Sequence, residues 1–215
     1  MIALWRRFSI HPWVLPFTEW RIGVKWRLAG RPVPPPPLVK QALVKEYQRR
    51  FGLRVFVETG TFTGDMINAV VGRFDRIFSI ELDDQWYAKA VARFAARRTV
   101  TLLQGDSGTR LCEVLAALHE PALFWLDAHY SGPATARGSL DSPIVQELEA
   151  IAGHPVRGHV VLIDDMREFN GSGGYPEGTE PLPSQPDLAR RGFEAGPLRS
   201  GKAQDAGRSV CGAMR

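Results

Sequence analysis

The chain has few cysteines and no long apolar run, and each shortage excludes a class of protein. Its two cysteines, Cys112 and Cys211, are too few for a disulfide framework or a zinc cluster. Cys112 falls within a helical pattern, so we expect it to pack in the core. No stretch is long and apolar enough to cross a bilayer, and charges and prolines interrupt the N-terminal stretch where a signal peptide would need an apolar core. We therefore expect a cytoplasmic protein.

Charge is distributed unevenly along the 215 residues, whose net charge is +4. Residues 1–50 contain ten Lys/Arg and two acids, whereas residues 51–175 contain eleven Lys/Arg and sixteen acids. The excess positive charge therefore belongs to an N-terminal arm, and the middle of the chain is acidic. This distribution argues against nucleic acid as the partner of the whole protein.

The N-terminal arm, residues 1–37, combines four of the six tryptophans with arginine and lysine and ends in four prolines. Tryptophan beside arginine suits a membrane interface or an anionic partner. The alternative is an arm that packs its indoles against the domain and leaves its cations in water. We favour the second, and peripheral contact with a membrane or anionic partner stays open.

From residue 38 to residue 175 the pattern is that of one α/β domain. A helix is predicted over 38–51, and further helices over 65–73, 84–97, 108–119 and 143–153, with Ser107 as an N-cap. Strands that are apolar on both faces alternate with these helices, which predicts a Rossmann-like, doubly wound parallel sheet in a three-layer α/β/α arrangement. The strand patterns are RVFVE (54–58), RIFSIE (76–81), VTLLQG (100–105), ALFWLD (122–127) and HVVLID (159–164).

Every predicted strand ends in an acid. The acids are Glu58, Glu81, Asp106, Asp127 and the pair Asp164 and Asp165. In a parallel sheet these ends open onto one edge, where ligands bind. A carboxylate there costs desolvation unless something pairs with it, so the edge is expected to bind a cation, a metal, or a ligand rich in hydroxyls and amines.

These residues resemble a known family. The spacing Glu-x-Gly-x-x-x-Gly after the first strand, SIELD after the second and GDS after the third resemble class I S-adenosylmethionine (SAM)-dependent methyltransferases. Within that family, WLDAHY and LIDDM are similar to the metal-dependent small-molecule O-methyltransferases of the catechol and macrolide-sugar kinds. The resemblance covers about residues 53–174, and the order of the motifs carries it.

The resemblance implies a role for each matching residue. Glu58, Gly60, Thr61 and Gly64 would form the loop beneath the methionine and ribose of the cofactor. Glu81 would accept hydrogen bonds from both ribose hydroxyls. Asp106 and Ser107 would lie beside the adenine, and Asp127 would bind the cofactor on the side of its amine and the metal.

The same resemblance implies a metal site and a base. Asp127, Asp164 and Asp165 would hold a divalent ion, and oxygen ligands of this kind suit Mg²⁺. The metal would lower the pKa of an acceptor hydroxyl, with Asp127 and His129 as catalytic residues and His129 as the general base. His129 could equally be a loop residue that only orders the site, and Tyr130 is a weaker candidate base. The implied acceptor is a small hydroxylated molecule, a sugar or secondary metabolite.

The end of the chain departs from the family pattern. Family members finish with an antiparallel hairpin that completes a seven-stranded sheet, but residues 176–215 hold five prolines, six glycines and one aromatic, Phe193. We therefore expect the hairpin strands to be missing and the tail to be irregular or disordered. The abrupt change after Pro176 suggests a frameshifted or truncated end.

Two other functions stay open. A nicotinamide-dependent oxidoreductase on the same fold would also use Glu81, but the first turn lacks Gly-x-Gly-x-x-Gly and has Thr61 where glycine is needed. A non-catalytic protein that keeps the methyltransferase-like fold and binds a partner through its arm is the third interpretation.

Overall fold

The computed structural model describes residues 14–32, 34–127, 143–164, 193–197 and 210–214. By its internal contacts the chain divides into two units, Met1–Leu43 and Val44–Arg215. The smaller unit contains helix α1, Val14–Leu28, and the first half of α2, Pro37–Phe51. The larger unit contains the sheet and the candidate site.

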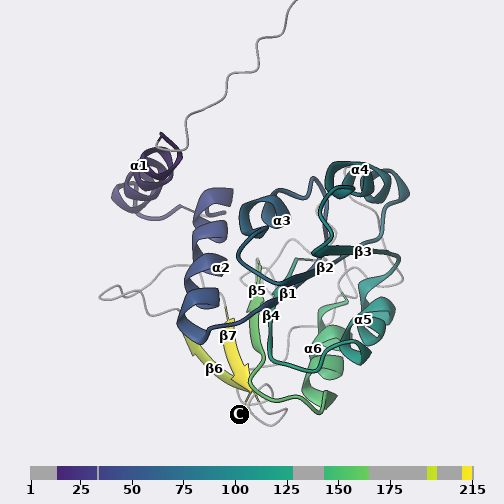
Figure 1. Cartoon of the computed structure of the whole chain (residues 1–215). Coiled ribbons are helices and arrows are strands. Elements are labelled where there is room, and N and C mark those ends of the chain that lie inside the picture. The colour runs from purple at the N-terminus through teal and green to yellow at the C-terminus, as the bar shows by residue number, and fades with distance from the viewer. Residues whose placement is uncertain (1–13, 33, 128–142, 165–192, 198–209, 215) are drawn as a thin grey trace, which may run out of the picture. The chain divides into compact units, whose positions relative to one another are not determined.

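The predicted parallel sheet is confirmed. Among the described residues, seven strands form one sheet in the order β3-β2-β1-β4-β5-β7-β6 (Figure 1). Strands β1 to β5 run parallel to one another, with helices following them along the chain, as doubly wound folds require. The strands are β1 Val55–Thr59, β2 Arg76–Glu81, β3 Val100–Gln104, β4 Ala122–Leu126, β5 Val160–Ile163, β6 Phe193–Pro197 and β7 Val210–Met214.

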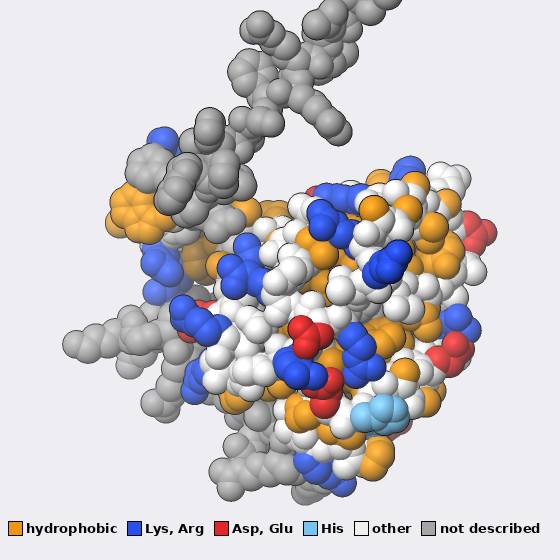
Figure 2. Space-filling view, in the orientation of Figure 1, with side chains coloured by type: hydrophobic (Ala, Val, Ile, Leu, Met, Phe, Trp, Pro, Cys, Tyr) orange, Lys and Arg blue, Asp and Glu red, His pale blue; other side chains and the backbone are white. Residues whose placement is uncertain are grey.

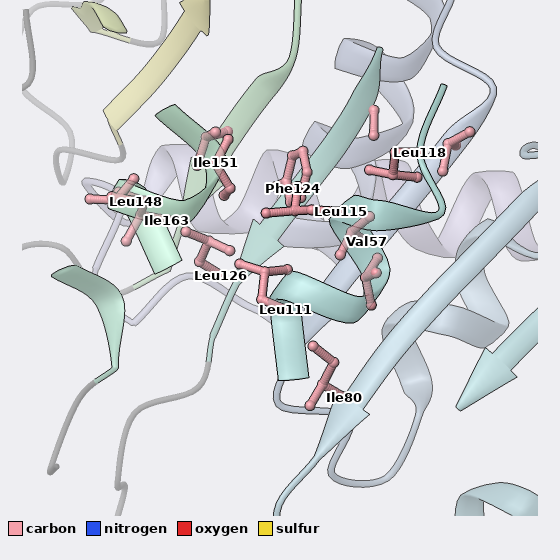
Figure 3. Close-up of a cluster of buried hydrophobic side chains, with 14 of the residues drawn as sticks. Val57, Ile80, Leu111, Leu115, Leu118, Phe124, Leu126, Leu148, Ile151 and Ile163 are labelled. Atoms are coloured by element: carbon pink, nitrogen blue, oxygen red, sulfur yellow. The ribbon is translucent and has the colours of Figure 1, made fainter. Parts of the chain in front are cut away.

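Helices cover both faces of this sheet. Helices α5, Ser107–Ala116, and α6, Ile144–Gly153, lie on one side, while α3, Asp65–Val70, and α4, Asp84–Phe94, lie on the other (Figure 1). The main apolar cluster fills the space between α5, α6 and the sheet (Figure 3). There Leu111, Leu148 and Ile151 pack against strand residues that include Phe124 and Ile163. Apolar burial on this scale is the main force holding the layers together.

Several element ends differ from the prediction. Helices α3, α4 and α5 end three residues before the predicted positions, because apolar periodicity marks a buried face and not the residue at which helical hydrogen bonds stop. Helix α1 forms within the arm, where no helix was predicted, and the indole Nε1 of Trp26 donates to Pro32 O at 2.7 Å beyond its end. Cys112 is exposed on α5, so its predicted place in the core is wrong.

The prediction that the C-terminal hairpin strands are missing is also wrong. Strand β7 pairs antiparallel with β5, with Val160 opposite Ala213 and Leu162 opposite Cys211, and β6 pairs antiparallel with β7. Residues 193–197 and 210–214 are therefore strands, whereas the other tail residues lie outside the described part of the chain. The prediction failed because it considered only whether residues 176–215 could form structure by burying their own apolar side chains. A strand added to the existing β5 edge gains backbone hydrogen bonds that depend little on side-chain period.

The described surface carries charges of both signs. Acidic and basic side chains are interspersed on the face shown in Figure 2. One group of exposed ion pairs joins Arg54 Nε to Asp75 and to Glu120, each at 3.2 Å, and Arg76 also pairs with Glu120. Exposed pairs of this kind contribute little, about 0–1 kcal/mol each. Among the described helices, none has the length and apolar content needed to cross a membrane.

Candidate active site

The carboxyl-terminal edge of the sheet brings the predicted acids together. Strands β3, β2, β1, β4 and β5 are consecutive neighbours in the sheet, and Asp106, Glu81, Glu58, Asp127 and Asp164 lie at or just after their ends. The backbone holds this edge in register, since Asp127 N donates to Thr59 O at 3.1 Å and Asp164 N donates to Leu126 O at 2.9 Å. Acids that are more than forty residues apart in the chain therefore share one edge.

The loop after β1 turns through three left-handed residues. Gly60 has φ +84°, Gly64 has φ +75°, and between them Phe62 has φ +46°. Glycine adopts this conformation without strain, but phenylalanine does so rarely. A Cβ on Gly64 would lie 2.6 Å from the Phe94 ring of α4. Gly64 is therefore required for the close packing of the loop on α4, in addition to its backbone angle.

Glu81 at the end of β2 binds the loop directly. Its Oε2 accepts a hydrogen bond from Phe62 N at 2.6 Å, and its Oε1 accepts one from Asp83 N at 2.9 Å. The side chain is 7% exposed. Because each carboxylate oxygen has a second acceptor position, Glu81 can hold the loop and still accept hydrogen bonds from a vicinal diol. Its ribose-binding role stays a prediction.

Glu58 lies beneath the loop and is 2% exposed. Ser79 Oγ donates to Glu58 Oε2 at 2.7 Å, and Thr61 Oγ1 lies 2.6 Å from Ser79 Oγ. Because Ser79 uses its one hydroxyl hydrogen on Glu58, Thr61 is the donor to Ser79. Burial raises the pKa of Glu58 to about 8, which the Ser79 hydrogen bond opposes and the Glu81 charge reinforces. Glu58 and Thr61 therefore support the loop from below.

The turn between β3 and α5 contains the next two predicted residues. Asp106 is the N-cap of α5, and its Oδ1 accepts a hydrogen bond from Gly108 N at 2.9 Å. Ser107, predicted as the N-cap, is instead the first helical residue and is buried. Asp106 is the N-cap because its carboxylate accepts a hydrogen bond from the first turn of α5 and is stabilised by the positive end of the helix dipole.

Two of the three predicted metal ligands lie on adjacent strand ends. Leu126 and Ile163 are paired in the sheet, so Asp127 and Asp164 follow side by side, and Asp164 is 5% exposed. Two neighbouring carboxylates form an oxygen donor set that fits Mg²⁺. The third ligand, Asp165, and the candidate bases His129 and Tyr130 lie outside the described residues. Within the described part of the chain, no group of three or more acidic, histidine or cysteine side chains is close enough to hold an ion.

Sequence reasoning missed an aromatic pair beside the loop. The Phe62 ring lies 4.4 Å from the Trp86 ring, and Lys89 Nζ lies 3.8 Å above the centre of Trp86. Phe62 is 41% exposed. The sequence shows Phe62 between two glycines of the loop, which suggests an unusual backbone at this position. Only the backbone angles show that Phe62 is strained.

Comparison with family models and with curated protein sequences finds no match, whereas solved structures show the same fold. One is the O-methyltransferase TomG from Streptomyces achromogenes in complex with SAM, at 15% identity and TM-score 0.56, covering 91% of this chain and 88% of that chain. Another is an O-methyltransferase from Bacillus cereus in complex with S-adenosylhomocysteine (SAH), at 14% identity and TM-score 0.56, covering 93% and 91%. A third is the SAH-bound methyltransferase PaMTH1 from Podospora anserina, at 12% identity and TM-score 0.55, covering 100% and 99%. The chain therefore has the α/β fold seen in these methyltransferases, as the resemblance predicted.

Proposed function

We propose that this protein is a SAM-dependent methyltransferase that transfers a methyl group to the hydroxyl of a small acceptor with the help of a divalent ion. The observation that carries the proposal is the row of acids along the carboxyl edge, with Glu81 held against the loop after β1. SAM is a sulfonium cation with a ribose diol, so an acidic edge attracts it and Glu81 provides acceptors for the diol.

The chain's own residues would bind and align the reactants. In the transfer, a bond forms between the acceptor oxygen and the methyl carbon, and the bond between that carbon and sulfur breaks with its electron pair leaving on sulfur. Such an in-line displacement is accelerated mainly by alignment, to which the rigid loop and Glu81 contribute by fixing the cofactor. Asp127 and Asp164, with Asp165, would hold the ion, which supplies a lower pKa for the acceptor hydroxyl. His129 would accept the hydroxyl proton.

Calorimetric titration of the purified chain with SAH, with NAD as a control, tests the cofactor. We expect micromolar SAH binding that is lost in Glu81→Ala, and no binding of NAD. Binding of NAD instead would support an oxidoreductase. Binding of neither nucleotide to a chain shown to be folded would support a non-catalytic role.

Metal dependence needs a separate titration. We expect Mg²⁺ to bind the wild type and to bind at least about tenfold more weakly to Asp164→Asn, because the amide lacks the carboxylate charge. Unchanged SAH affinity in that variant would show that the loss is local to the ion. Equal Mg²⁺ affinity in both proteins would exclude Asp164 as a ligand.

A further inference from the structure

A buried carboxyl group that the proposed mechanism does not use lies next to the candidate site. Glu147, in the first turn of α6, is 1% exposed. Its carboxyl group faces the hydroxyls of Thr59, the last residue of β1, and Ser107, the first residue of α5. Both hydroxyl residues are buried as well. Three elements thus meet at one small polar cluster, which we call the Glu147 cluster.

Two atoms of the Glu147 cluster are not satisfied by well-formed hydrogen bonds. Among the described residues, neither Glu147 Oε1 nor Thr59 Oγ1 makes a hydrogen bond by strict geometry. Buried polar atoms in folded proteins nearly always make hydrogen bonds. Two buried oxygens without well-formed hydrogen bonds in one cluster therefore point to a role beyond packing. Strands β4 and β5 contribute apolar residues, including Leu126 and Ile163, to the cluster in which α6 packs.

The charge state of Glu147 follows from its surroundings. Burial raises the pKa of its carboxyl group to about 7, the neighbouring charge of Asp106 reinforces the rise, and the hydroxyls of Ser107 and Thr59 oppose it. Asp106, on the β3–α5 turn, is the described charged group that acts on it. Below neutral pH the group is therefore a neutral acid, with one hydroxyl donor and one carbonyl acceptor for its two hydroxyl neighbours.

The Glu147 cluster joins the two turns that are proposed to hold the cofactor. Thr59 directly precedes Gly60 in the loop after β1, and Ser107 directly follows Asp106 in the turn after β3. The start of α6 is also packed tightly against the start of α5, because a Cβ on Gly108 would lie 2.3 Å from Gln146 Oε1. A change at Glu147 would therefore be transmitted to both turns.

We propose that Glu147 is a positioning residue that links Thr59 to Ser107 and so sets the separation of the two turns of the cofactor site. The proposal rests on the proposed function, because that function identifies the ligand held by the two turns. Ionised Glu147 would place a second negative charge beside Asp106 and push the turns apart.

The test measures SAH dissociation constants by calorimetry between pH 6 and pH 8.5 for the full chain and three variants. Glu147→Gln keeps a neutral group with a donor and an acceptor, whereas Glu147→Leu removes both at similar volume. Glu149→Gln changes an exposed carboxylate on the same helix and is the matched control. Glu58 also titrates in this range, but it is present in every variant, so the difference from wild type isolates Glu147.

We expect the wild type and Glu149→Gln to lose SAH affinity above neutral pH, by up to about tenfold per pH unit. Glu147→Gln should match wild type at pH 6 within about twofold and lose less affinity as pH rises. Glu147→Leu should bind about tenfold more weakly at pH 6 without losing thermal stability. Identical affinities and pH profiles in all four proteins would mean a purely structural role and overturn the proposal. So would affinity that rises with pH in wild type but not in Glu147→Gln. Failure of the wild type itself to bind SAH would instead refute the proposed function, and this inference with it.

Discussion

At the scale of single residues, the carboxyl groups of the candidate site differ in burial and in hydrogen bonding. Glu81 accepts hydrogen bonds from two backbone N–H groups at the edge of the sheet. Glu58 in β1 and Glu147 in α6 are buried, and burial raises the pKa of Glu58 to about 8 and that of Glu147 to about 7. The edge therefore combines a glutamate that holds the loop through backbone hydrogen bonds with two buried acids whose raised pKa values favour the neutral form.

Glu58→Gln should make stability less dependent on pH. Folded Glu58 has a pKa of about 8 against 4.5 for an unperturbed glutamate, so the unfolded chain loses its proton first as pH rises. The wild type should therefore lose up to about 1.4 kcal/mol of unfolding free energy per pH unit between pH 4.5 and 8. Urea unfolding at pH 6 and pH 8 measures the slope, and Glu58→Gln should show a smaller one while still accepting the Ser79 hydrogen bond. Parallel slopes in the two proteins would contradict the neutral state of Glu58.

At the scale of elements, the β1–α3 loop is defined by packing as well as by backbone angles. Gly64 and Gly72 both have positive φ, +75° and +88°, but only Gly64 is crowded. Its nearest neighbour is the Phe94 ring, whereas a Cβ on Gly72 would meet nothing within 4 Å. Substitutions at Gly64 and Gly72 therefore distinguish the free energy lost to a left-handed backbone angle from the free energy lost to a steric clash.

Gly64→Ala should cost about 2–4 kcal/mol of unfolding free energy, and Gly72→Ala about 1–2 kcal/mol. Chemical denaturation of the two variants beside wild type gives both values. In the double variant Gly64→Ala/Phe94→Leu the combined loss should be smaller than the sum of the single losses, because the smaller side chain leaves room for the added methyl group. Equal costs at the two glycines would show that Phe94 yields without strain.

A pair of buried histidines joins elements at the opposite end of the sheet. Ala122 N donates to His159 Nδ1 at 3.0 Å, which leaves His159 Nε2 as the donor to His154 Nδ1 at 2.9 Å. His154 Nε2 then donates to Leu115 O at 2.9 Å. Both imidazoles are neutral in this relay, and the order of donors fixes their tautomers. The relay ties β4, β5 and α5 together.

The histidine relay should make the fold sensitive to acid. Burial lowers the pKa of His159 to about 4 from 6.5. Between these two pH values His159 is protonated in the unfolded chain but neutral in the folded chain. Stability from this group is therefore complete above pH 6.5 and is lost progressively down to about pH 4. Histidine NMR should show His159 neutral with hydrogen on Nε2 from pH 6.5 down to about pH 5, with exposed His119 as the reference signal. Protonation of His159 near pH 6 would rule out the relay.

At the scale of the whole molecule, the sheet is completed by strands from the far end of the chain. Cys211 lies in β7, at the last position paired with β5, opposite Leu162, and between two positions paired with β6. Cys211→Pro should destabilise the protein by about 3 kcal/mol or more, since proline removes a backbone donor and fits poorly inside a paired strand. Cys211→Ser keeps the backbone donor and should cost less than Cys211→Pro. Thermal unfolding distinguishes the two, and equal melting temperatures would mean that the tail does not pair with β5.

The parts of the fold that depend on local sequence patterns were predictable. Strands β1 to β5 are apolar on both faces and alternate with amphipathic helices, and this pattern is enough for a parallel sheet. The acids at the strand ends were predictable too, because parallel strands share one carboxyl edge. The Glu147 cluster was not, since a single glutamate in a helical pattern carries no sign of the hydroxyls it will face.

What the sequence determined by itself is thus the parallel sheet and the edge that carries the candidate site with its acids. Strand period is a local property, and helices between successive strands make those strands parallel. The tertiary structure alone decided three features: strands β6 and β7, the strained Phe62, and the burial of Glu147 between Thr59 and Ser107. Each depends on a partner supplied by a distant element. An open β5 edge, the Glu81 carboxylate and the close approach of α5 to α6 exist only once the chain has folded.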